Sequence, residues 1–155
     1  MHVIPEAVLV AATVGNGLLA GMFFAFSCGV APGLRRVDDR AYVTAFRAIS
    51  RSIVNLLFLL VFLGAPIATA AAAALHLDGA RQEVLACVVA ALALSLLSFA
   101  VTVLVNVPLN NRLDSTEPVE EARALFERRW VRWNAVRTVV CTLSFLALVP
   151  ALAQL

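Results

Sequence analysis

The sequence predicts an all-α integral membrane protein, an up-down-up-down bundle of four transmembrane helices in one domain. Of its 155 residues, 62% are hydrophobic and only 14% are charged, which is too little polar surface to cover a soluble domain. Four apolar stretches are each long enough to cross a hydrocarbon core, which takes about 20 residues of helix. Nearly all basic residues fall in two connections between these stretches.

The first predicted span covers residues 7–31. No Lys or Arg precedes it, and its apolar run is too long for the core of a cleaved export signal, so we expect it to remain attached. Its residues Gly15, Gly17 and Gly21 would let neighbouring backbones approach closely.

The second and third spans are predicted over residues 53–75 and 84–107. The alanine run 70–74 indicates tight packing near the outer end of the second span. Because only a short turn, 75–84, joins the two spans, they should run antiparallel.

The fourth span, residues 136–153, follows a charged segment at 117–132. That segment alternates acidic residues and arginines at helical spacing, with apolar residues between them. It is typical of an amphipathic helix at or just inside the cytoplasmic interface, continuing into the fourth span.

The arginines predict how the bundle is oriented. All twelve basic residues are arginine, and eleven lie in the connections 35–51 and 112–137, whereas Arg81 alone lies on the opposite side. The positive-inside bias therefore places both long connections in the cytoplasm and both termini outside. Scattered arginines beside helix ends, without interleaved aromatic residues, give no reason to expect a nucleic-acid partner.

Nothing in the sequence favours a metal or another cofactor. Cys28, Cys87 and Cys141 are isolated in or near apolar spans and are typical of small buried hydrophobic residues. The chain has two histidines. His2 lies near the N-terminus, and His76 is expected to reach toward lipid head groups. The spans contain no Asp or Glu, which argues against a di-iron bundle and against a proton-coupled transporter.

Polar residues instead gather at the cytoplasmic end of the spans. In the third helix, Asn106 and Asn110 are four residues apart and share a face if the helix persists through Pro108. The second helix begins with a stripe of this spacing, formed by Arg47, Arg51 and Asn55. The fourth helix carries another stripe at the same end, formed by Trp130, Asn134, Arg137 and Cys141. The first helix adds Phe23, Phe24, Phe26 and Pro32 at this level.

Each of these residues also has an ordinary explanation, since arginine and tryptophan anchor helices at membrane interfaces and asparagine caps helix ends. Arg137, however, lies inside an apolar stretch, where an unpaired charge costs about 2.5–3.5 kcal/mol. Its partners are either the amide groups of Asn106, Asn110 and Asn134 or an anionic ligand. We expect Asn106 and Asn110 to face Arg137, and Asn111 to cap a helix or face solvent.

Three motifs give the chain a resemblance to a known family. They are F-x-x-F-S-x-G-V-x-P-G-L at residues 23–34, N-V-P-L-N-N-x-L at residues 106–113, and W-x-x-W-N-x-x-R at residues 130–137. Together they resemble the small four-helix membrane proteins of the DUF1772 or anthrone oxygenase-like family. The resemblance covers nearly the whole chain.

The resemblance implies oxygenation of an anthrone, a tricyclic phenolic ketone, to an anthraquinone by O2. An anthrone loses a proton from its central carbon to give an electron-rich enolate that reacts with O2 directly, so neither a metal nor a flavin is strictly required. Phe23, Phe26 and Trp130 would then line an apolar slot for the flat substrate, with Arg47 and Asn55 as further binding residues. Arg137 would hold the enolate oxygen. Three amide side chains would assist it, those of Asn106, Asn110 and Asn134.

No histidine or carboxylate is evidently placed to act as general base, so ionisation of the substrate would depend on stabilisation by Arg137. Two other functions remain open. The same pocket suits a non-catalytic membrane protein that binds a lipid or a hydrophobic small molecule, with a homo-oligomer possible in either case. A small exporter or helper subunit fits less well, because small exporters usually carry a membrane-embedded acid.

Overall fold

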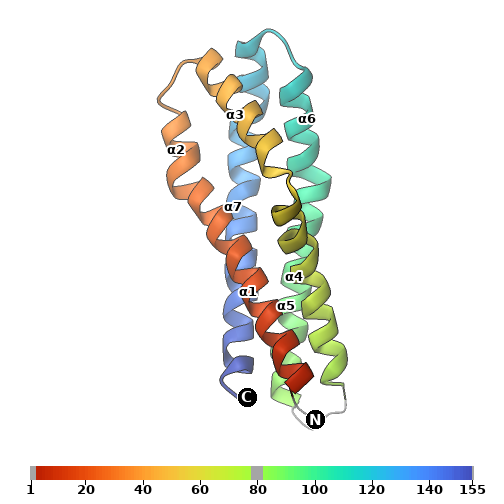
Figure 1. The fold of residues 1–155 in the computed structure, drawn as a ribbon. Helices are drawn as coiled ribbons and strands as arrows, with labels where there is room; N and C mark the ends of the chain where they lie inside the picture. Colours follow the sequence, from red (N-terminus) through yellow and green to blue (C-terminus); the bar gives the residue numbers. More distant parts are fainter. Residues whose placement is uncertain (1–2, 78–81, 155) are drawn as a thin grey trace.

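The computed structural model describes residues 3–77 and 82–154 of the chain (Figure 1). Arg81 and His2, which entered the predictions above, lie outside the described residues. The described elements, in chain order, are α1 (Val3–Ala25), the π-helical turn η1 (Phe26–Val30), α2 (Ala31–Leu34), α3 (Asp39–Ile53), α4 (Leu56–Leu75), α5 (Gln82–Val101), the π-helical turn η2 (Thr102–Asn106), α6 (Val107–Ser115) and α7 (Val119–Leu152).

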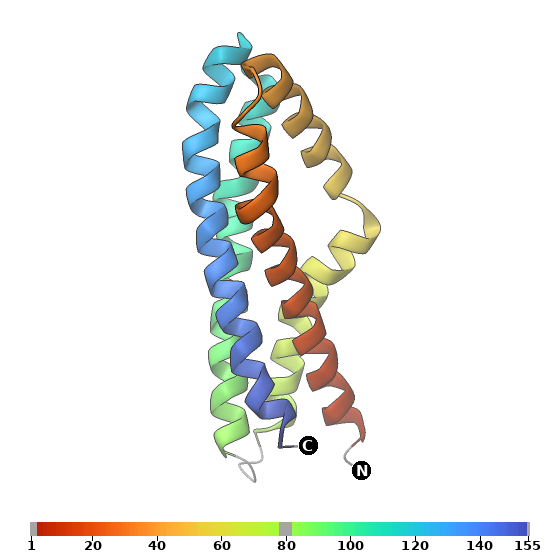
Figure 2. The same cartoon turned by 90° about the vertical axis from the view of Figure 1, so that its left-hand side faces the viewer.

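The four long helices α1, α4, α5 and α7 run side by side and form a bundle (Figure 1). Helix α7 packs against both α1 and α5, and α4 also packs against both, so the four helices close into a ring. The predicted all-α fold is therefore confirmed. Both ends of the described chain lie at one end of the bundle, and the connections 35–38 and 116–118 lie at the other (Figures 1 and 2).

Four continuous helical stretches are long and apolar enough to cross a membrane: Val3–Leu34, Leu56–Leu75, Gln82–Ser115 and Val119–Leu152. A helix of 34 residues is about 50 Å long, whereas the hydrocarbon core is about 30 Å thick. Three of the stretches therefore extend well past the core, and only α4, with 20 residues, matches its thickness. The bundle thus has a part of membrane length and a projecting part at the end of the two long connections.

Helix α3 occupies the side of the projecting part that α4 does not reach. The side chain of Asp38 caps its N-terminus by accepting a hydrogen bond from the Ala41 amide at 2.9 Å. Its apolar stripe, Tyr42, Val43 and Phe46, packs against α6 and the first turns of α7. Residues 119–132 form the start of α7, which continues into the fourth span as expected, and their buried stripe contacts α3 and α6: Ala122, Phe126 and Trp130.

We expected Arg47, Arg51 and Asn55 to lie on one helix that continues into the second span. That helix is instead broken at Val54 and Asn55, so that α3 and α4 meet at an angle (Figure 2). The side chain of Asn55 forms hydrogen bonds with the end of α3 and with the start of α4. Its Oδ1 accepts a hydrogen bond from the Phe58 amide, and its Nδ2 donates one to the carbonyl oxygen of Ser52, each at 3.0 Å. Asparagine is among the best N-cap residues, so it starts a new helix here rather than continuing the previous one.

Both π-helical turns precede a proline by two residues. Pro32 follows η1 and Pro108 follows η2. Proline lacks an N–H and its ring clashes with the carbonyl group four residues earlier. A wider turn before the proline relieves that clash and lets each helix continue, to Leu34 in one case and to Ser115 in the other.

A fully buried polar layer ties the four long helices together near the middle of the bundle. Asn16 of α1 donates to Thr69 Oγ1 of α4 at 3.0 Å and accepts from Ser144 Oγ of α7 at 3.0 Å. Ser144 is also placed to donate to the Ala91 carbonyl oxygen of α5 at 2.9 Å. In an apolar surrounding such bonds fix the register of the helices.

Glycines allow the closest contacts of α1. A Cβ atom on Gly15 would lie 3.0 Å from the Cβ of Ala65, and one on Gly17 would lie 3.1 Å from the ring of Phe145. Both glycines therefore serve close packing, as predicted. The prediction is wrong for Gly21, where an added Cβ would meet no atom within 4 Å.

Candidate functional site

A cavity lies where the membrane-length part of the bundle joins the projecting part. It contains about 540 Å³ of atom-free space, a value that includes space open to the exterior. Its wall combines aromatic and aliphatic side chains with a few polar groups. The lining residues are Met22, Phe23, Phe26, Phe46, Ile49, Ser50, Ile53, Val54, Phe58, Thr102, Asn106, Val107, Asn110, Trp130, Asn134 and Arg137.

Among the described residues, Arg137 is the only charged one in this lining, and only 5% of it is exposed. Its guanidinium group donates to Asn134 Oδ1 at 2.8 Å and to Thr102 Oγ1 at 3.3 Å. Arg137 precedes the end of α7 at Leu152 by fifteen residues, which is about 22 Å of helix. If Leu152 marks the outer edge of the hydrocarbon, the guanidinium group lies inside its inner edge.

Asn134 fixes the position of Arg137 against the first helix. Its Nδ2 donates to the Phe23 carbonyl oxygen at 3.0 Å and to Ser27 Oγ at 2.8 Å. Ser27 Oγ also lies 3.0 Å from Thr138 Oγ1. With its nitrogen held by α1 and η1, the amide of Asn134 must present its oxygen to Arg137.

Aromatic rings supply the remaining stabilisation of the charge. The Cζ atom of Arg137 lies 4.2 Å from the centroid of the Phe23 ring and 5.5 Å from that of the Trp130 ring. Cation–π contacts strengthen when water is excluded. No ion pair of Arg137 with a carboxylate occurs within residues 3–77 and 82–154, so the charge is held by neutral groups alone.

Several buried polar atoms of the lining have no hydrogen-bond partner in the part of the chain that the structure describes. The donors are Arg137 Nε, Trp130 Nε1 and Asn106 Nδ2, and the acceptors are Asn106 Oδ1 and Asn110 Oδ1. An unpaired buried polar group costs about 1–3 kcal/mol. Such a concentration around one cavity is what a ligand with both donor and acceptor groups would satisfy.

Seven predicted site residues line this cavity: Phe23, Phe26, Asn106, Asn110, Trp130, Asn134 and Arg137. Asn111 is exposed on α6, as we expected. The partners of Arg137 differ from our expectation, because Asn106 and Asn110 share the cavity with it but neither amide is bonded to it. The adjoining helix contributes the hydroxyl group of Thr102, and the bonded amide, Asn134, belongs to α7 itself.

Two predicted binding residues, Arg47 and Asn55, are not part of the lining. The guanidinium group of Arg47 donates to the Leu113 and Thr116 carbonyl oxygens and to Glu117 Oε1, at 2.8–3.0 Å. Asn55 caps α4 as described above. Both were predicted on one continuous helix with Arg51, and the break at residue 54 removes the common stripe on which that prediction depended.

Thr102 is the most informative residue that the sequence reasoning missed. It lies four residues before Asn106, which lies four before Asn110, so the same spacing argument would have found it. Ser27, inside the first motif, was not assigned a role either. Ser27 lies in η1 and Thr102 lies in η2, so the site is bordered by two π-helical turns. Such turns are frequent at functional sites.

The other reactive residues lie elsewhere. Cys141 is buried and donates to Ser98 Oγ at 3.0 Å, whereas Cys28 is exposed, contrary to our prediction that it is buried. His76 is also buried rather than reaching outward, and its Nδ1 lies 2.7 Å from the Ala72 carbonyl oxygen. The described residues contain no group of three or more His, Cys, Asp or Glu side chains that could hold a metal ion.

Chemically, the cavity presents aromatic rings to an apolar molecule and unpaired hydrogen-bond donors to negative charge on an oxygen atom of that molecule. The free Nε–H of Arg137 and the indole N–H of Trp130 are the donors for such an oxygen. Donors fixed before a ligand arrives stabilise developing charge without a reorganisation cost.

Comparison with known proteins identifies the family. The family model described as anthrone oxygenase matches residues 56–147, more than half of the chain. The matched stretch contains the second and third motifs, with Asn106, Trp130 and Arg137, and it leaves out the first motif. No curated protein and no solved structure matches the chain. Because the family model covers more than half of the chain, the chain belongs to the anthrone oxygenase family.

Proposed function

We propose that this protein is a cofactor-independent membrane monooxygenase that oxidises anthrone-like or other lipophilic phenolic substrates with O2. The observation that carries the proposal is the buried guanidinium group of Arg137, which is held by neutral groups and keeps its Nε–H free beside the cavity. A buried cation without a carboxylate partner is not neutralised by the protein, so it can stabilise an anion that forms in the cavity.

The overall reaction balances without an added reductant. Deprotonation at the central CH2 group of an anthrone gives a carbanion delocalised onto the carbonyl oxygen. Electron transfer to O2 and recombination form a carbon–oxygen bond and a hydroperoxide, which loses water to leave a second carbonyl group. The substrate is oxidised by four electrons, one oxygen atom enters the product, and the other leaves as water.

The residues of the cavity would act on the first step. Phe23, Phe26 and Trp130 would hold the rings, and Arg137 Nε with Trp130 Nε1 would stabilise the enolate oxygen. The carbonyl oxygens of Asn106 and Asn110 would accept hydrogen bonds from phenolic hydroxyl groups of the substrate. Asn134 would act as a positioning residue, because it bonds the guanidinium group and α1 at once.

One observation favours a second candidate, a protein that binds a hydrophobic small molecule without turnover. The lining contains neither a histidine nor a carboxylate among the described residues, so the groups that most often act as general bases are missing from it. In the catalytic proposal the substrate ionises because Arg137 lowers the energy of its anion, which requires a weakly acidic C–H bond such as that of an anthrone.

Oxygen uptake by the purified protein in lipid nanodiscs, with a panel of anthrones, tests the proposal. We expect one atom of 18O from 18O2 in each quinone. Arg137→Gln should lower kcat by about 100-fold, because removing a fixed donor to an oxyanion usually costs that much. Arg137→Lys should retain part of the activity, and Arg132→Gln, which changes an exposed arginine of α7, should have no effect.

The outcomes separate the two candidates. Anthrone binding that is weakened by Arg137→Gln, without oxygen uptake by the unaltered protein, would establish the binding protein in place of the oxygenase. Uptake that persists unchanged in Arg137→Gln would remove Arg137 from the mechanism.

A further inference from the structure

An apolar hollow lies on the outer surface between α1 and α4, beside the cavity. It holds about 670 Å³ of space, much of it open to the surroundings. Asn55 is its only polar lining residue, and the amide of Asn55 is engaged in capping α4. The lining residues are Leu18, Leu19, Met22, Ile53, Asn55, Leu57, Phe58 and Val61.

The hollow and the cavity share a wall. Met22, Ile53 and Phe58 line both spaces, and each is half-buried. They come from α1, from the end of α3 and from the start of α4. These three residues therefore lie between the hollow and the cavity.

The break between α3 and α4 places the hollow here. Figure 2 shows the junction at residues 54–55 bowed outward from the rest of the bundle. A continuous helix would have carried its side chains straight past α1. Ile53 and Phe58, which line both spaces, lie on either side of the break.

The hollow lies at the depth where hydrocarbon is expected. Leu57 is 74% exposed and Leu18 is 56% exposed, and both belong to stretches long and apolar enough to cross a membrane. On the opposite, projecting side of the cavity, aromatic rings pack against one another. The Phe46 ring centroid lies 4.8 Å from that of Trp130 and 4.7 Å from that of Phe126.

We infer that the hollow between α1 and α4 is the route by which a membrane-dissolved, uncharged aromatic substrate reaches the cavity from the bilayer, with Met22, Ile53 and Phe58 as the gate. The chemical class of the substrate rests on the proposed function, whereas the route rests on the shared wall. The substrate must pass in its neutral form, because the route offers an anion no partner. It ionises only beside Arg137.

The test follows the rate at which anthrone binds to the protein in nanodiscs without oxygen, through quenching of Trp130 fluorescence in a Trp133→Phe background. The filled variant combines three changes that fill the hollow without touching the cavity lining: Leu18→Phe, Leu57→Phe and Val61→Phe. The matched control makes the same kinds of change at exposed positions of the same two helices that line neither space: Val14→Phe, Leu56→Phe and Leu60→Phe.

We expect the filled variant to bind anthrone at least about fivefold more slowly than the control, with a dissociation constant within about twofold, because a blocked route slows association and dissociation alike. Equal rates in the two variants would overturn the inference. It would also fail if Val107→Phe, on the far rim of the cavity, slowed binding while the filled variant did not. A phospholipid retained in the hollow, with anthrone binding at the unaltered rate, would overturn it as well.

These results are distinguishable from a failure of the proposed function. Slowed binding in the filled variant supports the route even if no anthrone is ever oxidised. Oxygen uptake with unchanged binding rates supports the oxygenase and rejects the route.

Discussion

Asn16 and Asn106 are both fully buried in the bundle, but their amide groups are in opposite states. Asn16 donates two hydrogen bonds and accepts one, and it joins three helices. Neither amide atom of Asn106 has a partner among the described residues, and the side chain borders the cavity. The first amide has the arrangement expected of a structural group, and the second that of a group kept free for a ligand.

Leucine substitutions at these two positions should therefore have opposite effects. Asn16→Leu should lower the free energy of unfolding by about 1–2 kcal/mol, because bonds between membrane helices are lost. Asn106→Leu should leave stability unchanged or raise it by about 1 kcal/mol, because an unsatisfied buried amide is removed. Thermal unfolding in micelles measures both changes.

The same Asn106→Leu protein should bind anthrone at least about tenfold more weakly, which corresponds to about 1.4 kcal/mol. Asn111→Leu, one residue beyond Asn110 and exposed, is the control that should bind normally. A loss of stability in Asn106→Leu as large as in Asn16→Leu would mean that Asn106 has a structural partner.

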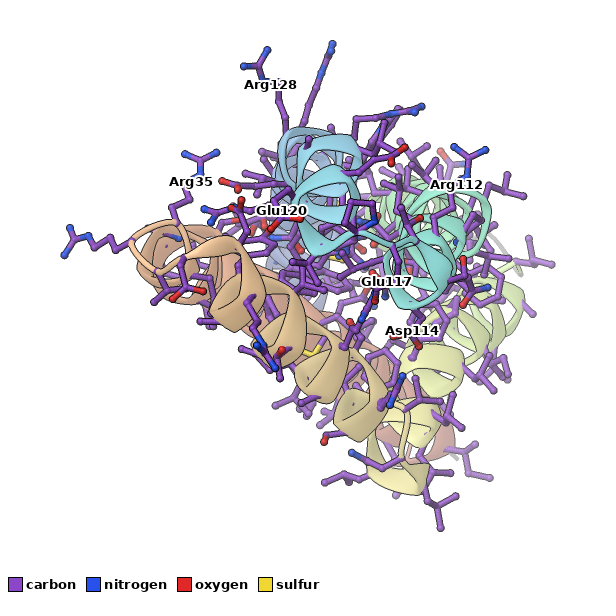
Figure 3. The ribbon with its side chains drawn as sticks, turned by 90° about the horizontal axis from the view of Figure 1, so that it is seen from above. Arg35, Arg112, Asp114, Glu117, Glu120 and Arg128 are labelled. Atoms are coloured by element: carbon purple, nitrogen blue, oxygen red, sulfur yellow. The ribbon has the colours of Figure 1, made fainter. Side chains whose placement is uncertain are left out.

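At the scale of the helix, α3 is fastened over the cavity by Arg47. Its guanidinium group reaches the corner between α6 and α7, where it bonds two carbonyl oxygens and the carboxylate of Glu117. The neighbouring pair, Arg51 with Asp114 at 3.3 Å, is more exposed. Figure 3 views this end from above, and shows Asp114 and Glu117 close to α3, with Arg112 and Arg128 pointing away from the bundle.

Arg47→Met should loosen α3 more than Arg51→Met does. The first change removes charge-assisted bonds at a partly buried site and should cost about 2 kcal/mol, whereas the second removes an exposed pair worth about 0–1 kcal/mol. Hydrogen exchange of the α3 amides in nanodiscs measures the difference. Equal protection of α3 in the two variants would show that the apolar stripe alone holds the helix.

At the scale of the whole molecule, the orientation in the membrane is still a prediction from the arginines. Eleven of the twelve lie in segments 35–51 and 112–137, and the structure gathers the connections that belong to these segments at the end of the bundle opposite the chain ends. Reversing the molecule would move this charged end across the bilayer, which the positive-inside bias disfavours.

Labelling of single cysteines tests this orientation. With the three native cysteines replaced by alanine, Ala153→Cys should react with a membrane-impermeant maleimide in right-side-out vesicles, and Ser115→Cys should react only after the membrane is opened. Both positions are exposed, so burial does not distinguish them. The reverse pattern would invert the predicted topology.

Local spacing was enough to predict most of the candidate site. Asn106 and Asn110, or Trp130, Asn134 and Arg137, share a face of one helix because they repeat every three or four residues. The same reasoning failed for Asn55, because it assumed a continuous helix across Val54, and for Arg47, because its guanidinium group is bonded to the corner between α6 and α7. A cap formed by Asn55 competes with helix continuation, and the spacing of apolar residues does not reveal which of the two wins.

The sequence alone was sufficient for the number of spans, for their antiparallel order and for most of the residues that meet at one end, because these follow from composition and from the periodicity of a helix. It did not predict which polar atoms are bonded and which are free, and it did not predict the hollow between α1 and α4. Those depend on how far apart four helices stand at a given level. That spacing depends on contacts between residues far apart in the chain, such as Gly15 with Ala65 and Asn16 with Ser144.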